Sequence, residues 1–206
     1  MAKSTEKKAR KPSQQRAHAT VEAILEAAAR IVEREGVGRS FGTNRIAREA
    51  GVSIGSLYEY FEGKDAILKA IGERHIQRVR ALMDQAFAEL RGAPLDQAVA
   101  HVVDGLFLLH GARPALQPPL HHEFSRQLGL DPFIESDRYL ERKLTDWLAE
   151  RRPGVDRDAL AARAFVAIRA GRSVIIHAFA EALPPERAGS VRTVLKEMLV
   201  RTLDTP

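Results

Sequence analysis

Residues 43–68 read TNRIAREAGVSIGSLYEYFEGKDAIL, and one glycine near the middle separates two short helical patterns. The first helix is expected over residues 43–50 and the second over residues 53–61. Gly51 between them can adopt the left-handed backbone conformation that a sharp turn needs. Two short helices joined by such a turn are typical of a helix-turn-helix.

The apolar residues of this stretch have the spacing that such a motif requires. Ala47 is small at the point where the two helices cross closely, and Leu57 returns to the shared core. Ile46 and Val52 are expected to fill the space between the helices. A glycine-rich phosphate loop is the rival interpretation, but it needs a preceding strand and the order GxxxxGK[ST], and the sequence has neither.

The second helix turns mostly small or hydroxyl-bearing residues outward. These residues are Ser53, Ile54, Gly55, Ser56, Tyr58 and Glu59. Small side chains let a helix approach a DNA groove closely, hydroxyl groups can bind phosphates or base edges, and an isoleucine can contact a thymine methyl. Gly55 costs about 1 kcal/mol relative to alanine inside a helix, and close approach to DNA would explain it.

Together with the helix before it, this stretch resembles the DNA-binding segment of TetR-type regulators over about residues 17–70. The resemblance includes the tail Tyr58-x-Tyr60-Phe61-x-x-Lys64. It implies phosphate contact at the start of the first short helix, groove contact by the second, and a lysine that opens the next helix. The residues assigned to DNA contact are Thr43, Arg45, Ser53, Ile54, Gly55, Ser56, Tyr58, Tyr60 and Lys64.

One of these assignments has a separate physical argument, and another stays open. A lysine at a helix N-terminus, as at Lys64, is a natural seat for phosphate. Tyr60 has two open interpretations, because it can pack against the preceding helix or contact DNA.

The charge is concentrated at the N-terminus. Residues 1–16 contain six basic residues and one acidic residue, and they account for the whole formal net charge of +5. Such an arm favours an anionic partner, although a solvated tail is the alternative. The chain has no cysteine, which excludes disulfides and thiolate metal sites. We expect no secretory signal and no membrane span, and therefore a cytoplasmic protein.

Helical periodicity continues along the rest of the chain, without the alternation typical of strands. We therefore expect an all-α protein of about nine helices. It divides into a disordered arm over residues 1–16, a three-helix DNA-binding domain over 17–66, and a larger helical domain over 67–206. The helix that begins at Lys64 joins the two domains.

The resemblance implies a homodimer built from the last two long helices, expected over residues 157–183 and 185–203. Small residues on the first of these helices permit close approach, and an apolar stripe on the second would supply buried area. The residues assigned to the interface are Ala170, Ser173, Ala178, Val191, Val194, Leu195, Met198 and Leu199. The alternative is that the stripe packs inside its own subunit.

The resemblance also implies a small-molecule pocket among the middle helices. The candidate lining residues are Phe107, His110, His121, Phe124, Trp147, Phe165, Arg169 and Arg172. A buried arginine needs a partner, which could be an acidic ligand, Glu123 or Asp146. Structural ion pairs and core packing of the aromatic residues are the alternatives.

The sequence His121-His122-Glu123, with His110 and His177, raises the question of a metal site. Adjacent histidines on a helix point in different directions and chelate poorly, so we expect no metal. The sequence has no HExxH motif, and we expect no enzyme activity and no required cofactor.

The sequence therefore predicts a bacterial DNA-binding transcriptional regulator. We expect a repressor that a small-molecule ligand releases from a palindromic operator. A ligand-independent DNA-binding regulator and a metal-responsive sensor are the alternatives. The sequence leaves open the effector, the operator, the regulated genes, and the choice between repression and activation.

Overall fold

The computed structural model describes residues 12–116 and 131–204, which form helices and no strand in either range. The chain divides into two compact units, residues 1–70 and 71–206. The described part contains eight α-helices and one 3-10 helix, and confirms the all-α class. None of the described helices combines the length and apolar character that crossing a membrane needs.

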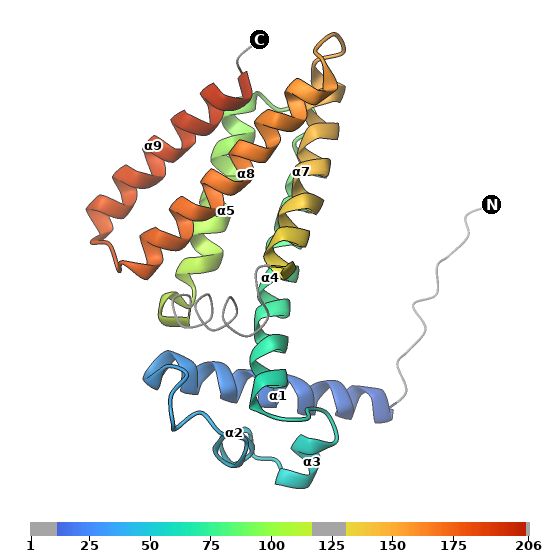
Figure 1. The fold of residues 1–206 in the computed structure, drawn as a ribbon, viewed down its shortest axis with the longest axis vertical. Helices are drawn as coiled ribbons and strands as arrows, with labels where there is room; N and C mark the ends of the chain where they lie inside the picture. The colour runs from blue at the N-terminus through green and yellow to red at the C-terminus, as the bar shows by residue number, and fades with distance from the viewer. Residues whose placement is uncertain (1–11, 117–130, 205–206) are drawn as a thin grey trace, which may run out of the picture. The chain divides into compact units, whose positions relative to one another are not determined.

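The first unit consists of three helices and the start of a fourth (Figure 1). These are α1 (Pro12–Glu35), α2 (Thr43–Ala50), α3 (Ile54–Tyr58) and α4 (Lys64–Glu89). Their apolar faces meet in one small core. Its buried residues include Ile24, Leu25, Ala28, Ile31, Val32, Phe41, Ile46, Ala47, Leu57, Ile67 and Leu68.

The turn between α2 and α3 has the geometry that the sequence predicts. Gly51 is left-handed, with φ 69° and ψ 29°. Its N–H donates to the carbonyl of Arg48 at 3.2 Å, and the N–H of Val52 donates to the carbonyl of Ala47 at 3.0 Å. This pair of bonds is a Schellman motif, which satisfies the last carbonyls of α2. Ala47 and Leu57 are buried beside the turn.

Two expected boundaries differ from the structure. α3 covers only Ile54–Tyr58 rather than residues 53–61, because Ser53 is its N-cap and the chain turns after Tyr58. α1 begins at Pro12, so residues 12–16 are helical instead of disordered. Proline suits this first turn because its missing N–H has no intrahelical partner to lose. The rest of the basic arm lies outside the described residues.

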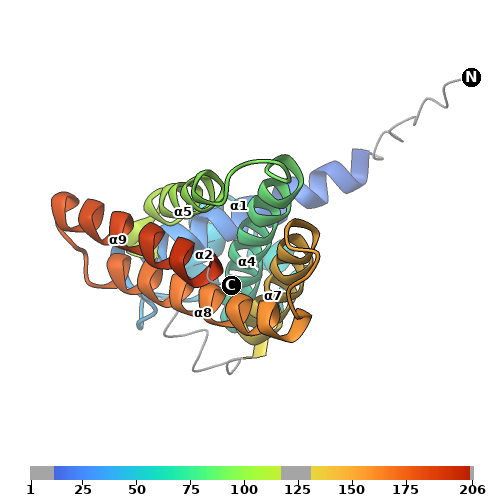
Figure 2. The same ribbon diagram turned by 90° about the horizontal axis from the view of Figure 1, so that it is seen from above.

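The second unit continues α4 and adds five helical elements. They are α5 (Leu95–Gly111), the 3-10 helix η1 (Pro114–Leu116), α7 (Asp131–Arg151), α8 (Arg157–Ala180) and α9 (Pro185–Asp204). α8 packs against α7 on one side and α9 on the other, and α5 packs against α9 (Figures 1 and 2).

The core of the second unit draws on α5, α7, α8 and α9. Its most deeply buried side chains are Val103, Leu148, Leu160, Ala164, Ile175 and Leu195. Phe87 of α4 is partly buried and packs against this core. The helices of the second unit therefore pack around one shared core.

The C-terminus of α8 carries a strained residue. Ala182 has a φ of 48°, the only described non-glycine residue with a positive φ. The N–H of Leu183 donates to the carbonyl of Ala178 at 3.3 Å, and the N–H of Ala182 donates to that of Phe179 at 3.2 Å. This Schellman motif normally has glycine at the left-handed position, where a Cβ costs roughly 1 kcal/mol.

Candidate functional sites

The outer face of α3 exposes residues that a folding core would normally bury. Ile54 is 39 % exposed and Tyr58 is 53 % exposed, whereas Leu57 on the opposite face is fully buried. Gly55 lies between the two exposed residues and is itself exposed. An apolar and aromatic surface on so short a helix indicates contact with another molecule.

The hydroxyl groups of Ser53 and Ser56 form a pair at the start of α3. The Ser53 Oγ accepts a bond from the backbone N–H of Ser56 at 3.0 Å and donates its own proton to the Ser56 Oγ at 2.9 Å. Ser53 therefore caps the helix, a role that serine fills well. Ser56 keeps its own hydroxyl proton for a further acceptor.

A second pair of hydroxyl groups joins α2 to α3. The Thr43 Oγ1 lies 3.2 Å from the Tyr58 hydroxyl, within hydrogen-bonding distance. Thr43 is the first residue of α2, where the N–H groups of the helix N-terminus favour an anion. One of the two protons is used in this bond, so the pair presents one remaining hydroxyl donor to an acceptor such as a phosphate oxygen.

The fold itself does not require glycine at position 55. A Cβ built on Gly55 would meet only the Ser53 Oγ, at 3.8 Å, which is ordinary contact. Packing inside the unit therefore gives no reason for glycine at this helical position, where it lowers helix stability. Close approach of another molecule to the helix backbone stays the prediction that the sequence makes for this glycine.

Lys64 and Tyr60 complete the predicted surface from the segment after α3. Lys64 is exposed as the first residue of α4, so its ammonium adds to the positive end of that helix. Tyr60 is 39 % exposed, so its ring is only partly withdrawn from solvent.

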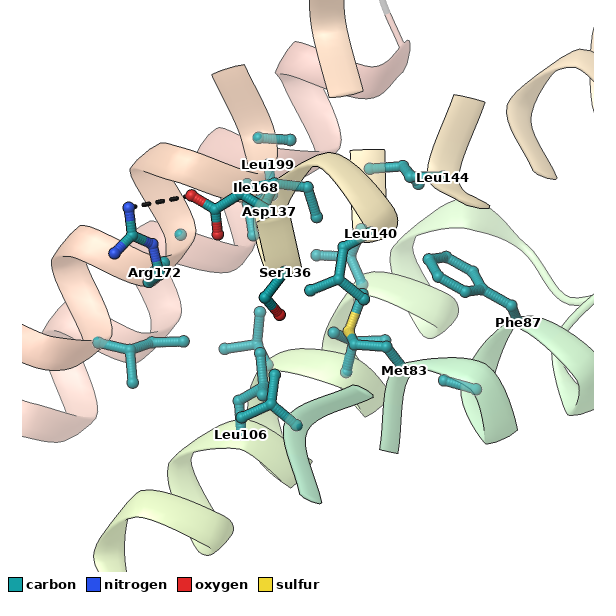
Figure 3. Close-up of a pocket in the computed structure, with 18 of the residues that line it drawn as sticks. Met83, Phe87, Leu106, Ser136, Asp137, Leu140, Leu144, Ile168, Arg172 and Leu199 are labelled. Atoms are coloured by element: carbon teal, nitrogen blue, oxygen red, sulfur yellow. Dashed lines mark ion pairs between the residues drawn. The ribbon is translucent and has the colours of Figure 1, made fainter. Parts of the chain in front are cut away.

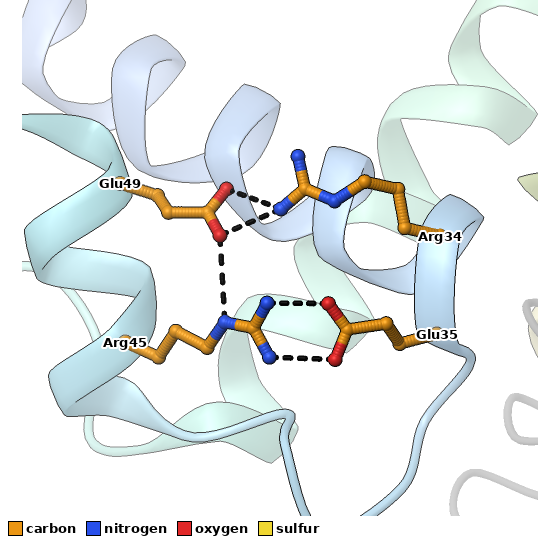
Figure 4. Close-up of polar contacts among 4 residues, drawn as sticks. All are labelled: Arg34, Glu35, Arg45 and Glu49. Atoms are coloured by element: carbon orange, nitrogen blue, oxygen red, sulfur yellow. Dashed lines mark hydrogen bonds and ion pairs between the residues drawn. The ribbon is translucent and has the colours of Figure 1, made fainter.

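Arg45 has carboxylate partners inside the same unit (Figure 4). Its Nη1 donates to Glu35 at 2.6 Å, its Nη2 also donates to Glu35, and its Nε lies 3.4 Å from Glu49. Arg34 donates to Glu49 as well, at 2.6 Å and 2.8 Å. A phosphate would have to compete with these carboxylates, so the predicted phosphate contact of Arg45 has no support here.

This network also lowers the pKa of two carboxyl groups. The hydrogen bond from Arg45, followed by one from Ser40, lowers the pKa of Glu35 to about 2. The hydrogen bond from Arg34 lowers the pKa of Glu49 in the same direction. The four charged side chains tie α1 to α2 and thereby orient the first helix of the helix-turn-helix.

The second unit encloses a cavity of about 160 Å³ (Figure 3). That space corresponds to on the order of ten water molecules, or a small organic ligand. Its lining is mostly apolar. The apolar residues include Ile76, Val79, Met83, Phe87, Leu95, Val99, Val103, Leu106, Leu140, Leu144, Trp147, Ile168, Ile175, Leu199 and Leu203.

The cavity also contains an ion pair between α7 and α8. Arg172 Nη2 lies 3.0 Å from Asp137 Oδ2, and the Asp137 side chain is almost completely buried. Desolvation raises the pKa of Asp137, while the charge of Arg172 opposes this shift. Ser136, one residue earlier, is also buried and accepts a bond from Arg80 Nε at 3.2 Å.

Two histidines meet in the same lining. The Nε2 atoms of His75 and His110 lie 3.3 Å apart. His110 Nδ1 lies 2.8 Å from the Leu106 carbonyl, which can only accept, so Nδ1 carries a proton. Burial lowers the pKa of His110, so its neutral ring accepts at Nε2 the proton of His75.

Sequence profiles identify both units. The profile described as "Bacterial regulatory proteins, tetR family" matches residues 24–71, and the one described as "Tetracyclin repressor-like, C-terminal domain" matches residues 94–203. The chain belongs to the TetR family. It is therefore a TetR-family transcriptional regulator, and its helix-turn-helix is a DNA-binding one. No curated protein resembles this regulator closely enough to count as a relative.

Solved TetR-like structures share the fold of this family member at low sequence identity. A transcriptional regulator from Rhodococcus sp. Rha1 is 18% identical, covers 90% of this chain and 98% of its own, and has a TM-score of 0.68. The fatty acid degradation regulator FadR from Bacillus halodurans is 16% identical over 93% of this chain and 96% of its own, with a TM-score of 0.66. A regulator from Aquifex aeolicus is 17% identical over 87% and 97%, with a TM-score of 0.64.

The cavity of this TetR family member includes three of the predicted ligand residues, which are His110, Trp147 and Arg172. His121 and Phe124 lie outside the described residues, as does Glu123, one of the suggested arginine partners.

Three other predicted ligand residues lie elsewhere in the unit. Phe107 is buried in the core, 5.7 Å from the ring of Phe179, rather than in the cavity wall. Phe165 is 47 % exposed, and the Arg169 guanidinium stacks on its ring at 3.5 Å. Arg169 also pairs with Glu141 at 2.9 Å. Helical periodicity alone cannot separate core, cavity and surface on a helix whose neighbours are unknown.

The arginine partners also differ from those suggested by the sequence. Asp146 pairs with Arg157, not with an arginine of the cavity. The partners are instead Asp137 for Arg172 and Glu141 for Arg169. Structural ion pairs were one of the two interpretations open to the sequence, and both arginines make them.

The predicted interface residues on α8 and α9 divide into two groups. Ala178, Leu195 and Leu199 are buried in the core of their own subunit, so the prediction that they face a partner is wrong. Val194 is 63 % exposed, and Ala170, Ser173, Val191 and Met198 are at least partly exposed. An apolar helical stripe can serve either kind of contact, which is why the sequence could not divide them.

Sequence reasoning missed His75, Ser136 and Asp137 in the cavity. For the latter two a signal existed, because they interrupt an apolar stripe of α7 that continues through Leu140 and Leu144. Nothing in the sequence links His75 to His110. Across the described residues, no three potential ligands gather where they could hold a metal ion.

Proposed function

We propose that this regulator is a repressor that binds a palindromic operator as a homodimer and is released by a small molecule. The observation that carries the proposal is the cavity, which is mostly apolar and belongs to the second unit, whereas α3 belongs to the first. A repressor needs both a DNA-contacting surface and a site where an effector binds.

The DNA-contacting surface is proposed to consist of the α3 face and its flanks. Thr43, Tyr58 and Lys64 would bind phosphates, and Ile54 with Gly55 would enter the major groove. The shortage of charge on α3 fits this division, because base-edge contacts depend on shape while basic residues elsewhere provide attraction.

α4 is the proposed route from effector to DNA. This helix starts with Lys64 in the first unit and lines the cavity from His75 to Phe87 in the second. A ligand that favours one position of α4 would shift the population toward dimers whose recognition helices no longer fit adjacent grooves.

The proposed dimer interface is the exposed face of α8 and α9, defined by Val166, Ala170, Ser173 and Val194. Val166 is 50 % exposed and Val194 is 63 % exposed, a poor arrangement for a lone subunit. A two-fold axis through this face would place equivalent side chains of the two subunits together.

The N-terminal arm is proposed to add phosphate contacts. Removal of residues 1–11, which hold five of the basic residues of the chain, should make the affinity for DNA less dependent on salt. If the slope of affinity against salt does not change, the arm makes no such contacts.

The test of the proposed function is an operator-binding assay on the full-length dimer. Tyr58→Ala and Lys64→Ala should each weaken binding, because each removes a proposed phosphate contact, while sedimentation of the dimer stays unchanged. If both variants bind the operator as tightly as the parent protein, the assigned surface is wrong. Release by candidate effectors in the same assay separates this function from a ligand-independent regulator.

A metal-responsive sensor is the second alternative, and no required cofactor is proposed. Elemental analysis of the purified protein tests this directly. A stoichiometric transition metal, with DNA binding that depends on it, would replace the small-molecule proposal. We also place the regulator in the cytoplasm as part of the proposal, since that is where its operator would be.

A further inference from the structure

The cavity has two chemically different ends. Arg80 Nε of α4 donates to Ser136 near the start of α7, and the ring of Phe87 further along α4 lies 6.4 Å from that of Trp147 near the end of α7. The two helices therefore run side by side in the same direction. Ser136 and Trp147 are separated by about 16 Å along α7, at 1.5 Å per residue.

The polar groups gather at the Ser136 end. Asp137 and its partner Arg172 lie there, and the His75–His110 pair follows on the side of α4 that precedes Arg80. Figure 3 shows Ser136, Asp137 and Arg172 on one side of the space, with Leu144 and Phe87 on the other. Beyond Ser136 the walls are aliphatic and aromatic.

The polar end contains one buried donor without a partner and a serine proton that no described group accepts. Arg172 Nε is buried without a hydrogen-bond partner, and Ser136 accepts from Arg80 while its own proton remains available. The Asp137 carboxylate is engaged by Arg172, and each Nε2 of the histidine pair faces the other. A buried donor left unpaired is costly, so a bound molecule gains by bringing an acceptor oxygen.

Trp147 marks the other end of the cavity, away from Ser136. Its Nε1 is the other buried side-chain nitrogen without a partner among the described residues, and its side chain is 6 % exposed. Both unpartnered atoms are donors, and both belong to residues that line this cavity.

We propose that the cavity binds an aliphatic chain with a neutral carbonyl group at one end, such as an ester, a lactone or an amide. The carbonyl oxygen accepts from Ser136 and Arg172, and the chain extends along α4 and α7 toward Trp147. The role of this molecule as effector rests on the proposed function, whereas its binding site rests on the cavity alone.

A neutral head group fits the local charges better than a carboxylate. Asp137 already neutralises Arg172 at 3.0 Å, so a carboxylate beside them would be a second buried anion. Desolvation raises the pKa of Asp137 in spite of the charges of Arg172 and Arg169, and a second carboxylate buried here would meet the same desolvation.

The binding test uses methyl esters of straight-chain acids with the full-length protein. Calorimetry measures the dissociation constant, and the fluorescence of Trp147, the only tryptophan of the chain, reports occupancy of the cavity. Methyl dodecanoate should bind more tightly than methyl hexanoate, with about a fourfold gain for each buried methylene. Calorimetric binding that leaves Trp147 fluorescence unchanged, or no binding of either ester, would overturn the proposal.

The head group is tested with dodecanoate as the ionised partner of the ester. The ester should bind at least about tenfold more tightly, because the carboxylate loses its hydration beside Asp137. If dodecanoate binds as tightly as the ester or more tightly, the neutral head group is wrong.

A matched pair of serine variants tests the position of the carbonyl. Ser136→Ala should weaken the binding of methyl dodecanoate about fivefold, which is the typical contribution of one hydrogen bond. Ser190→Ala, at an exposed serine of α9 that does not line the cavity, should leave the affinity unchanged. Equal affinities for both variants would remove Ser136 from the site.

An operator-release assay tests the ligand of the cavity and the proposed function of the protein separately. If the ester binds near Trp147 but the protein–DNA complex persists, the cavity assignment stands and the proposed function fails. If no ester binds while an unrelated compound releases the DNA, the function stands and the assigned ligand class fails.

Discussion

Replacement of Gly55 by alanine is predicted to have opposite effects on the stability of the protein and on its affinity for DNA. The added Cβ would meet only the Ser53 Oγ, at 3.8 Å, so the folded protein accommodates it without strain. Alanine is favoured over glycine in a helix by about 1 kcal/mol. The free energy of unfolding should rise by about that amount, and the midpoint of thermal unfolding by about 2–4 °C.

The affinity of the same variant for DNA should fall. If the backbone of α3 lies against the groove, the methyl group occupies space that DNA needs, and such overpacking costs about 1–3 kcal/mol. Binding should therefore weaken by about tenfold or more. Fluorescence anisotropy with labelled operator measures this change, and circular dichroism during heating measures the stability.

Gly189 in α9 provides the matched control. It is also helical and has nothing within 4 Å of a built Cβ. Gly189→Ala should stabilise the protein similarly and leave DNA affinity unchanged. An undiminished affinity in Gly55→Ala would refute close approach of α3 to DNA, and a loss of stability would refute the open surroundings of Gly55.

Three further predictions concern the rest of the molecule. The hydrogen bond from Arg45 lowers the pKa of Glu35 from 4.5 to about 2, so the stability that this pair adds is present above pH 4.5 and is lost as the pH falls toward 2. In Glu35→Gln the stability measured by circular dichroism should therefore depend less on pH in this range, and an unchanged pH dependence would refute the pair. Ala182→Gly should raise the free energy of unfolding by roughly 1 kcal/mol in denaturant titrations, because it relieves a left-handed alanine; no gain would mean that the φ of 48° carries no strain. Val194→Glu should shift sedimentation toward the monomer, whereas Leu108→Glu, at a residue that is 77 % exposed on α5, should not; equal behaviour of the two would move the interface elsewhere.

The first unit could be predicted from the sequence to within a few residues, because short-range rules decide it. Gly51 ends α2 by a local backbone conformation, and Ala47 and Leu57 are fixed by the crossing of two adjacent helices. The end of α3 was less predictable. Ser53 could have been an inner helical residue or a cap, and only its bond to the Ser56 N–H decides between them.

The second unit was predictable as a set of helices but not as a site. Which face of α9 is buried depends on α8 and α5, so the burial of Leu195 beside the exposure of Val194 could not be read from spacing. The ion pair of Asp137 with Arg172 joins residues that are far apart in the chain. Long-range pairing of this kind determines the cavity, and no local pattern encodes it.

The central claim is that the exposed face of α3, with Tyr58 beside it, reads a two-fold symmetric DNA site. The most direct measurement is selection of bound duplexes from a random-sequence library by the full-length protein, followed by sequencing. The account predicts enrichment of an inverted repeat whose half-sites are centred roughly one helical turn of DNA apart, and loss of that enrichment in Tyr58→Ala. A parent protein that enriches no repeat, or a Tyr58→Ala variant that enriches the same repeat equally well, would contradict it.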